Sequence, residues 1–179
     1  MSVGIDDISF YTSNFYLDLK SLADVHNIDE DKFYLGIGQE KMAIVAADED
    51  VVTMAANAAL PLLDSVDKDS ISTLMFATET GIDQSKAAGV YVHRLLGLSS
   101  RCRVVELKQA CYSATAAIQM ACALVARDPQ KKVLVVAAHP DDEVLGIGGT
   151  IAKHTDAGDQ VVSLIVAEGE TARNRSTEL

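Results

Sequence analysis

Two stretches of this sequence hold residues that could do chemistry, and they lie close together along the chain. The first is "ELKQACYSATAA", which contains Cys111. The second is "HPDDE", which begins at His139 and includes Asp141 and Asp142. A cysteine thiolate is a nucleophile, whereas an imidazole and two carboxylates are typical of a catalytic zinc site. The sequence therefore predicts two unrelated reaction centres, which the surrounding elements have to position.

Cys111 follows the apolar run "RVVEL" and opens a segment of helical pattern, residues 110–127. We expect its sulfur to lie among N–H groups of a helix N-terminus that have no partner within the helix, which would stabilise a thiolate. The alternative is an inert core thiol, which is common for free cysteines. Cys122 lies in the middle of the same pattern and is expected to be buried, and Cys102 lies near a loop.

Glu79 is a candidate acid, because it follows an apolar run in "TLMFATET". Parallel strands end at one edge of a sheet, so Glu79 could share the edge of Cys111 and act as a general acid or base. The alternative is an acid that caps a helix or lies solvated in a loop. Position along the chain does not decide between them.

The elements that must position these residues alternate between short apolar runs and helical patterns, which is typical of α/β folds. The runs "VLVVAA" and "VVSLIVA" have no polar alternation, so both are predicted as strands that are covered on two faces. We expect a single three-layer domain over residues 1–179, with a sheet of about five strands and a polar tail at 174–179. The predicted strands are 4–11, 73–78, 103–108, 132–138 and 160–167, and the predicted helices are 17–25, 50–64, 85–96, 110–127 and 144–157.

Composition limits the classes of partner. The 15 basic and 26 acidic residues give a net charge of −11, which argues against binding nucleic acid or anionic membranes. No apolar run reaches the length of a membrane span, and the N-terminus lacks the layout of a signal peptide, so a cytoplasmic protein is expected. Three cysteines without a CxxC spacing predict free thiols rather than a disulfide framework.

Several stretches in order, among them "VGIDDISFYT", "GIGQEKMA", "ATETGIDQSKAA" and "ELKQACYSATAA", resemble the first half of bacterial 3-hydroxy-3-methylglutaryl-CoA synthases, which have a thiolase-like fold. The resemblance covers about residues 2–138, and the synthases that add β-branches in polyketide assembly share it with those of the mevalonate pathway. It implies that Cys111 accepts an acetyl group from acetyl-CoA and that Glu79 is the acid/base of the condensation with acetoacetyl-CoA. The second half of the family, which supplies a histidine and acyl-CoA contacts, has no counterpart here.

The stretch "VLVVAAHPDDEVLGIGGTIAKH" and its continuation to about residue 173 resemble the opening of zinc-dependent N-deacetylases of the LmbE/PIG-L type. The resemblance implies that His139 and Asp142 bind zinc and that Asp141 is the general base. A third ligand, a downstream histidine in that family, is not found. His154 lies within a predicted helix and is expected to face solvent, so the site is incomplete and zinc is expected to bind weakly.

Both patterns meet at "KKVLVVAA", and we interpret the chain as a natural or engineered fusion. A synthase-like part over residues 1–138 would be completed by a Rossmann-like βαβ unit over residues 139–173, with the direction of the last strand left open. Three hypotheses follow: acyl-CoA chemistry at Cys111, zinc-dependent amide hydrolysis at His139, Asp141 and Asp142, and a folded chimera without turnover. The third is expected, because both sites lack partners. Acyl-CoA is the candidate ligand, and a homodimer could form through a thiolase-type surface.

Overall fold

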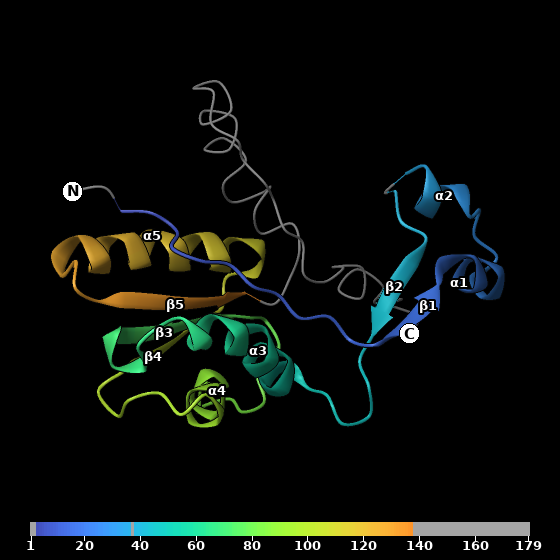
Figure 1. Cartoon of the computed structure of the whole chain (residues 1–179). Coiled ribbons are helices and arrows are strands. Elements are labelled where there is room, and N and C mark those ends of the chain that lie inside the picture. The colour runs from blue at the N-terminus through green and yellow to red at the C-terminus, as the bar shows by residue number, and fades with distance from the viewer. Residues whose placement is uncertain (1–2, 37, 138–179) are drawn as a thin grey trace, which may run out of the picture. The chain divides into compact units, whose positions relative to one another are not determined.

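The computed structural model of the chain describes residues 3–36 and 38–137, which belong to two compact units. The smaller unit is Thr12–Asp50, and the larger contains the described residues before and after it. Figure 1 labels the elements of both units.

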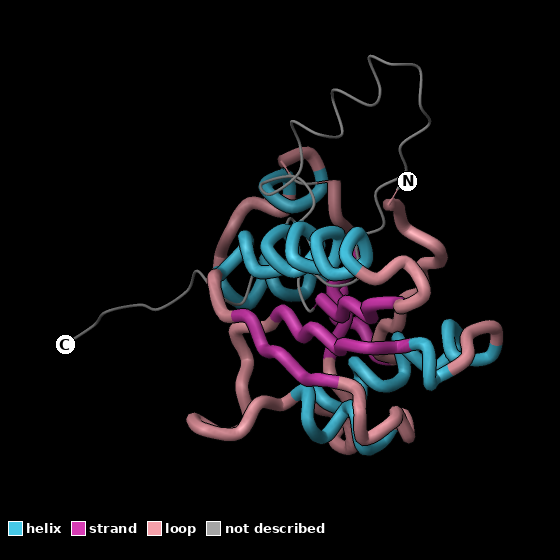
Figure 2. Tube along the Cα trace, turned by 90° about the vertical axis from the view of Figure 1, so that its left-hand side faces the viewer, coloured by secondary structure: helices cyan, strands magenta, loops and turns pink. Residues whose placement is uncertain are grey.

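The larger unit contains a parallel sheet of three strands, in the order β4-β3-β5. The strands are β3 (Ile71–Ala77), β4 (Arg103–Leu107) and β5 (Lys132–Ala137). Helix α5 covers one face of this sheet, and α3 and α4 cover the other (Figures 1 and 2). This arrangement confirms the predicted α/β class, and the three strands overlap three of the predicted ones.

The central strand carries the core. Leu74, Met75 and Phe76 are at most 1% exposed, because β3 has a strand on each side and helices over both faces. This is the burial that an apolar run without polar alternation predicts. The helices around it are α3 (Val51–Ala59), α4 (Gly89–Leu95) and α5 (Ser113–Arg127), with short 3₁₀ helices η1 (Leu60–Asp64), η2 (Lys68–Ser70) and η3 (Ala110–Tyr112).

All three of these α-helices are shorter than predicted, and local chemistry explains the bounds of α3 and α4. The α-helical part of the predicted helix 50–64 ends at Ala59 and continues as η1, because Pro61 has no N–H and disfavours the α conformation of the residue before it. The predicted helix 85–96 begins only at Gly89. Asp83 Oδ1 accepts the N–H groups of Ser85 and Lys86, so these residues form a turn instead.

The smaller unit is a two-stranded antiparallel sheet with two helices. Strand β1 (Phe15–Asp18) pairs with β2 (Lys41–Ile44), and α1 (Leu19–His26) and α2 (Asp31–Tyr34) lie between them in the sequence. The predicted helix 17–25 thus begins two residues later. The Asp18 side chain caps α1 by accepting the Lys20 N–H at 3.0 Å, and Asn27 ends it in a left-handed conformation.

The predicted strand 4–11 is wrong, because these residues form no strand in the structure. Aspartate is unfavourable in strands, and the Asp7 carboxylate accepts a hydrogen bond from the Ile8 N–H at 2.8 Å. Ile8 is 58% exposed, and Asp6 forms an ion pair with Lys132. The predicted strand 160–167, helix 144–157 and tail 174–179 lie outside the described residues, as does the Rossmann-like unit. A five-stranded sheet is therefore not confirmed.

Candidate functional site

The candidate site lies where β3 and β4 end side by side. Ala77 is opposite Leu107 in the register, and the Thr78 N–H donates to the Leu107 carbonyl oxygen at 3.2 Å, so the pairing extends one residue past β3. Glu79 comes next after Thr78, and Cys111 follows β4 by four residues. The sheet thus brings both segments to one edge, its carboxyl edge.

A direct hydrogen bond joins the two segments. The N–H of Ala110 donates to Glu79 Oε1 at 2.5 Å, and Ala110 is the residue before Cys111. Glu79 is exposed and Cys111 is half-buried, so both are accessible at this edge. The structure therefore places a carboxylate beside the backbone that carries the thiol, while the catalytic roles of both residues stay predictions.

The turn that carries Cys111 differs from the predicted helix start. Cys111 lies in η3, and α5 begins at Ser113. The N–H of Gln109 donates to Ser113 Oγ at 2.6 Å, and the N–H of Tyr112 donates to the Gln109 carbonyl at 3.2 Å. These two N–H groups and that of Ala110 all have partners. The sulfur was expected to lie among unpaired N–H groups, and this expectation is wrong for the N–H groups of Gln109, Ala110 and Tyr112.

Ala110 has a left-handed backbone, with φ of 46°. A residue with a Cβ rarely adopts this conformation outside special sites. Here it turns the chain between Leu107, at the end of β4, and Ser113, at the start of α5. In this conformation, the Ala110 N–H donates a hydrogen bond to the Glu79 carboxylate.

The other two cysteines lie in different environments. Cys102 is 7% exposed, and burial raises the pKa of its thiol. Cys122 is exposed, so the prediction that it is buried is wrong. It follows the buried Ala117 by five residues, which is about 140° around a helix, so it lies away from the sheet. An α5 sequence that is apolar on nearly all sides gave no sign of which face is buried.

The loop of residues 79–88 begins at Glu79. Acidic side chains fix this loop by accepting backbone N–H groups. Asp83 Oδ1 accepts from Lys86 at 2.8 Å and from Ser85 at 2.7 Å, and these bonds lower the pKa of the Asp83 carboxyl. Glu106, on β4, accepts the N–H of Ala88 with Oε2 at 2.6 Å. Sequence reasoning missed Glu106, although an acid within the apolar run "RVVEL" was a visible signal.

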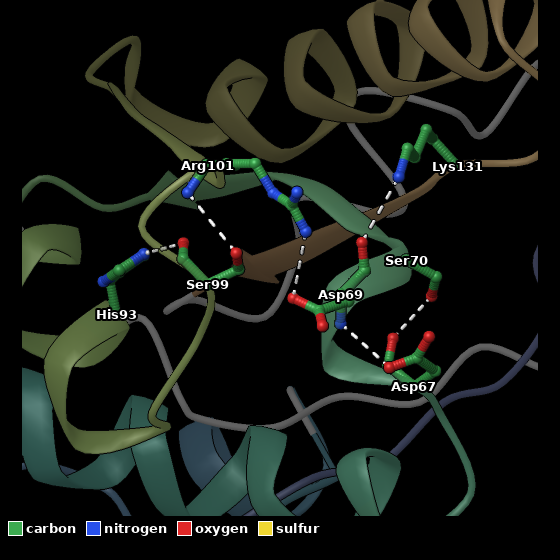
Figure 3. Close-up of polar contacts among 7 residues, drawn as sticks. All are labelled: Asp67, Asp69, Ser70, His93, Ser99, Arg101 and Lys131. Carbon is green, nitrogen blue, oxygen red and sulfur yellow. Dashed lines mark hydrogen bonds and ion pairs between the residues drawn. The ribbon is translucent and has the colours of Figure 1, made fainter.

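The opposite, amino edge of the sheet carries a separate cluster of polar contacts (Figure 3). His93 Nε2 contacts the Ser99 carbonyl oxygen at 3.0 Å, and Asp69 accepts from Lys131 and Arg101 at 3.3 and 3.5 Å. Apart from His93, which lies on α4, these residues come just before β3, β4 and β5, so this cluster is not at the edge of Cys111. The residues are Asp67, Asp69, Ser70, His93, Ser99, Arg101 and Lys131.

The second predicted centre lies outside the described residues, since His139, Asp141 and Asp142 follow Ala137. Within residues 3–36 and 38–137, no group of three or more His, Cys, Asp or Glu side chains could hold a metal ion. In the same part of the chain, no helix has the length and apolar character needed to cross a membrane.

Comparison with protein families gives one match over most of the chain. The family described as "Hydroxymethylglutaryl-coenzyme A synthase N terminal" matches residues 1–165. This match extends beyond residue 138, where the sequence pattern predicted its end, and it includes His139, Asp141 and Asp142. This match does not show a deacetylase-like part.

Curated relatives and solved structures agree with this family. The hydroxymethylglutaryl-CoA synthase of Enterococcus faecalis is 45% identical over 94% of this chain and 43% of its own length. The polyketide biosynthesis 3-hydroxy-3-methylglutaryl-ACP synthase PksG of Bacillus subtilis (strain 168) is 35% identical over 94% of this chain and 42% of its own. The chain thus spans about two fifths of the length of these relatives. A crystal structure of an HMG-CoA synthase complexed with CoA superposes with a TM-score of 0.74 and 43% identity, over 78% of this chain and 36% of that one.

Proposed function

Because the chain belongs to the hydroxymethylglutaryl-CoA synthase family, we propose that it carries the acyl-accepting part of such a synthase. Cys111 is the nucleophile and Glu79 the acid/base. The observation that supports this most directly is the 2.5 Å hydrogen bond from the Ala110 N–H to Glu79 Oε1. Strand order alone would leave the two residues at one edge, whereas this bond keeps the carboxylate next to the residue that bears the thiol.

The first step that we propose is acetyl transfer. The Cys111 thiolate bonds to the carbonyl carbon of acetyl-CoA, the bond from that carbon to the CoA sulfur breaks, and the departing thiolate takes up the proton that Cys111 lost. Cys111 is half-buried, so an acyl thioester can reach it. The structural relative that is complexed with CoA supports an acyl-CoA as the ligand class.

Glu79 serves the step after transfer. The acetyl group on Cys111 becomes a carbon nucleophile when a base removes a proton from its methyl group, and a carboxylate held at Ala110 is within reach of that position. The carbon then bonds to the ketone carbon of acetoacetyl-CoA, the π bond of that carbonyl breaks, and its oxygen takes up the proton that Glu79 removed. Glu79 is exposed, which leaves its carboxylate accessible to the proton that it has to move.

Acetylation of the full chain tests the nucleophile. We expect acetyl-CoA to add one acetyl group, which peptide mass spectrometry locates on Cys111. The variant Cys111→Ser should lose this adduct, and Cys122→Ser, which removes another accessible thiol, should keep it. An adduct on Cys122 alone, or none on the folded protein, would refute the assignment.

Condensation is a separate question, since the activities of the named relatives belong to proteins of which this chain spans about two fifths. We expect acetylation without sustained condensation. Of the two histidines within the described residues, His93 lies at the amino edge of the sheet and His26 belongs to the smaller unit. Turnover with acetoacetyl-CoA that is lost in Glu79→Ala would contradict this expectation and extend the proposal to the whole reaction.

The fusion stays a prediction, as do the division at residues 138 and 139 and the homodimer. No observation on the described residues favours the zinc-dependent reaction at His139, Asp141 and Asp142. The family match to residue 165 favours a single family over this part of the chain.

A further inference from the structure

Glu106 is an acid within the mainly apolar strand β4. It lies on β4 opposite Phe76 of β3, and it is half-buried. Alternate residues of a strand share a face, so Glu106 points to the same side as Val104, the side on which Gly89 of α4 packs. An acid in such a place requires a partner for its carboxylate.

Both oxygens of this carboxylate face the loop 79–88. Oε2 accepts the N–H of Ala88 at 2.6 Å, where the loop ends. Oε1 lies 3.7 Å from the position that a Cβ atom would take at Gly81, near the loop's start. This side chain therefore bonds the end of the loop and lies near its start, and Asp83 accepts two N–H groups in the middle of the loop.

Glu79 lies at the start of this loop, so the position of its carboxylate depends on how the loop is held. Residues 79–86 are all exposed, so no burial in the core fixes them, and hydrogen bonds have to do so. Ala88, by contrast, is fully buried. Glu79 itself follows the buried Thr78, whose N–H donates to the Leu107 carbonyl oxygen, and the Glu106 carboxylate adds a second attachment of the loop at Ala88.

We propose that Glu106 is a positioning residue for Glu79. By holding the loop at Ala88, it keeps the Glu79 carboxylate on the N–H of Ala110. Its importance for the reaction rests on the proposed function, but its effect on the geometry does not.

Amide hydrogen exchange of the full chain, resolved to single residues, tests the geometry. In Glu106→Leu, which keeps the bulk but has no acceptor, we expect the amides of Ala88 and Ala110 to exchange about tenfold faster, the effect of losing one hydrogen bond. In Glu106→Gln, the amide oxygen can still accept, so both amides should exchange as in the unchanged protein. Faster exchange at Ala88 with no change at Ala110 would overturn the proposal, since Glu106 would then act only locally.

A second variant tests the same proposal if Glu106→Leu does not fold. Ala88→Pro removes the donor and leaves Glu106 in place, and the φ of −60° at Ala88 suits proline. It should accelerate exchange at Ala110 as Glu106→Leu does, and unchanged exchange there would count against the proposal.

Asp67→Leu is the matched control, because Asp67 also accepts a backbone N–H, that of Asp69 at 3.0 Å, but at the amino edge of the sheet. Exchange at Ala110 should not respond to it. An equal acceleration in Asp67→Leu would mean that a general loss of stability explains the result and would overturn the proposal.

The chemical readout follows deuterium uptake from D₂O into the acetyl group on Cys111. We expect Glu106→Leu to slow this uptake about tenfold, with acetylation of Cys111 unchanged, and Glu106→Gln to restore it. Equal loss of acetylation and uptake would overturn a role through Glu79. If the unchanged protein takes no acetyl group, the proposed function fails, while the exchange at Ala88 and Ala110 still decides the positioning.

Discussion

The backbone of Ala110 gives the site a strained residue next to its nucleophile, with φ of 46°. A Cβ in the left-handed region costs about 1–2 kcal/mol, and glycine avoids this but loses about 0.5–1 kcal/mol more in chain entropy on folding. We therefore expect Ala110→Gly to raise the free energy of unfolding by about 0.5–1 kcal/mol in urea denaturation. Ala123→Gly, on the exposed face of α5, should lower it by about 1 kcal/mol. A loss of stability in Ala110→Gly would show that the left-handed turn is not strained.

The three thiols should differ in reactivity. Burial both hinders access to Cys102 and raises its pKa above the ordinary 9.0, so less thiolate is present at any given pH. We expect a small alkylating reagent to modify Cys111 and Cys122 in the folded protein well before Cys102. The rate at Cys102 should still be rising above pH 9.0, and denaturant should remove the difference. Site-resolved mass spectrometry measures all three, and a Cys102 that reacts as fast as Cys122 would contradict the buried position.

Individual residues show which features of the candidate site could be predicted from the sequence and which could not. That Glu79 and Cys111 share an edge could be predicted, because parallel strands fix which ends meet. The bond from Glu106 to Ala88 could not, since it depends on the direction of a side chain and on the return of a loop. The burial of Cys122 was predicted wrongly, because a helix that is apolar on most sides does not reveal its buried face.

At the scale of elements, the contact of α4 with the sheet depends on a glycine. A Cβ at Gly89 would lie 2.9 Å from Val104 Cγ1 and 3.2 Å from the Cβ of Phe76. Valine in a strand has little rotamer freedom to move aside. We expect Gly89→Ala to lower the free energy of unfolding by about 1–3 kcal/mol, the usual cost of overpacking, although alanine is the better helix former.

A second glycine provides the control. At Gly4 a Cβ would meet no heavy atom within 4 Å, so Gly4→Ala should leave the urea midpoint nearly unchanged. If Gly89→Ala were instead neutral or stabilising, α4 would have to pack less tightly on β3 and β4 than its position indicates.

Elements with continuous apolar runs were predicted best. Strands β3, β4 and β5 were each expected within a residue or two of their bounds, because each is a short run of mainly apolar residues in the sequence. Segment 4–11 failed because its apolar residues occur around two aspartates, one of which bonds the backbone locally. Helix bounds failed where a proline or an Asx turn decided them.

At the scale of the whole molecule, the resemblances seen in the sequence and the family match lead to different boundaries. The stretch from Val133 to about Arg173, which contains "HPDDE", indicated a second family, whereas the synthase family matches residues 1–165 and so continues through most of that stretch. The resemblance to the deacetylases covers about residues 133–173, which is a much shorter stretch than the one that the synthase family matches. The match over the longer stretch therefore carries more weight for the ancestry of the chain.

The zinc content of the purified chain tests whether the motif "HPDDE" binds metal. His139 and Asp142 would supply only two protein ligands, half of a tetrahedral zinc shell, so we expect zinc well below one ion per chain after dialysis. His139→Ala should then leave both the metal content and the acetylation of Cys111 unchanged. One tightly held zinc per chain that disappears in His139→Ala, but not in the control Cys111→Ser, would contradict this expectation. It would mean that residues beyond the described part complete a metal site, and that the chain does carry a second reaction centre.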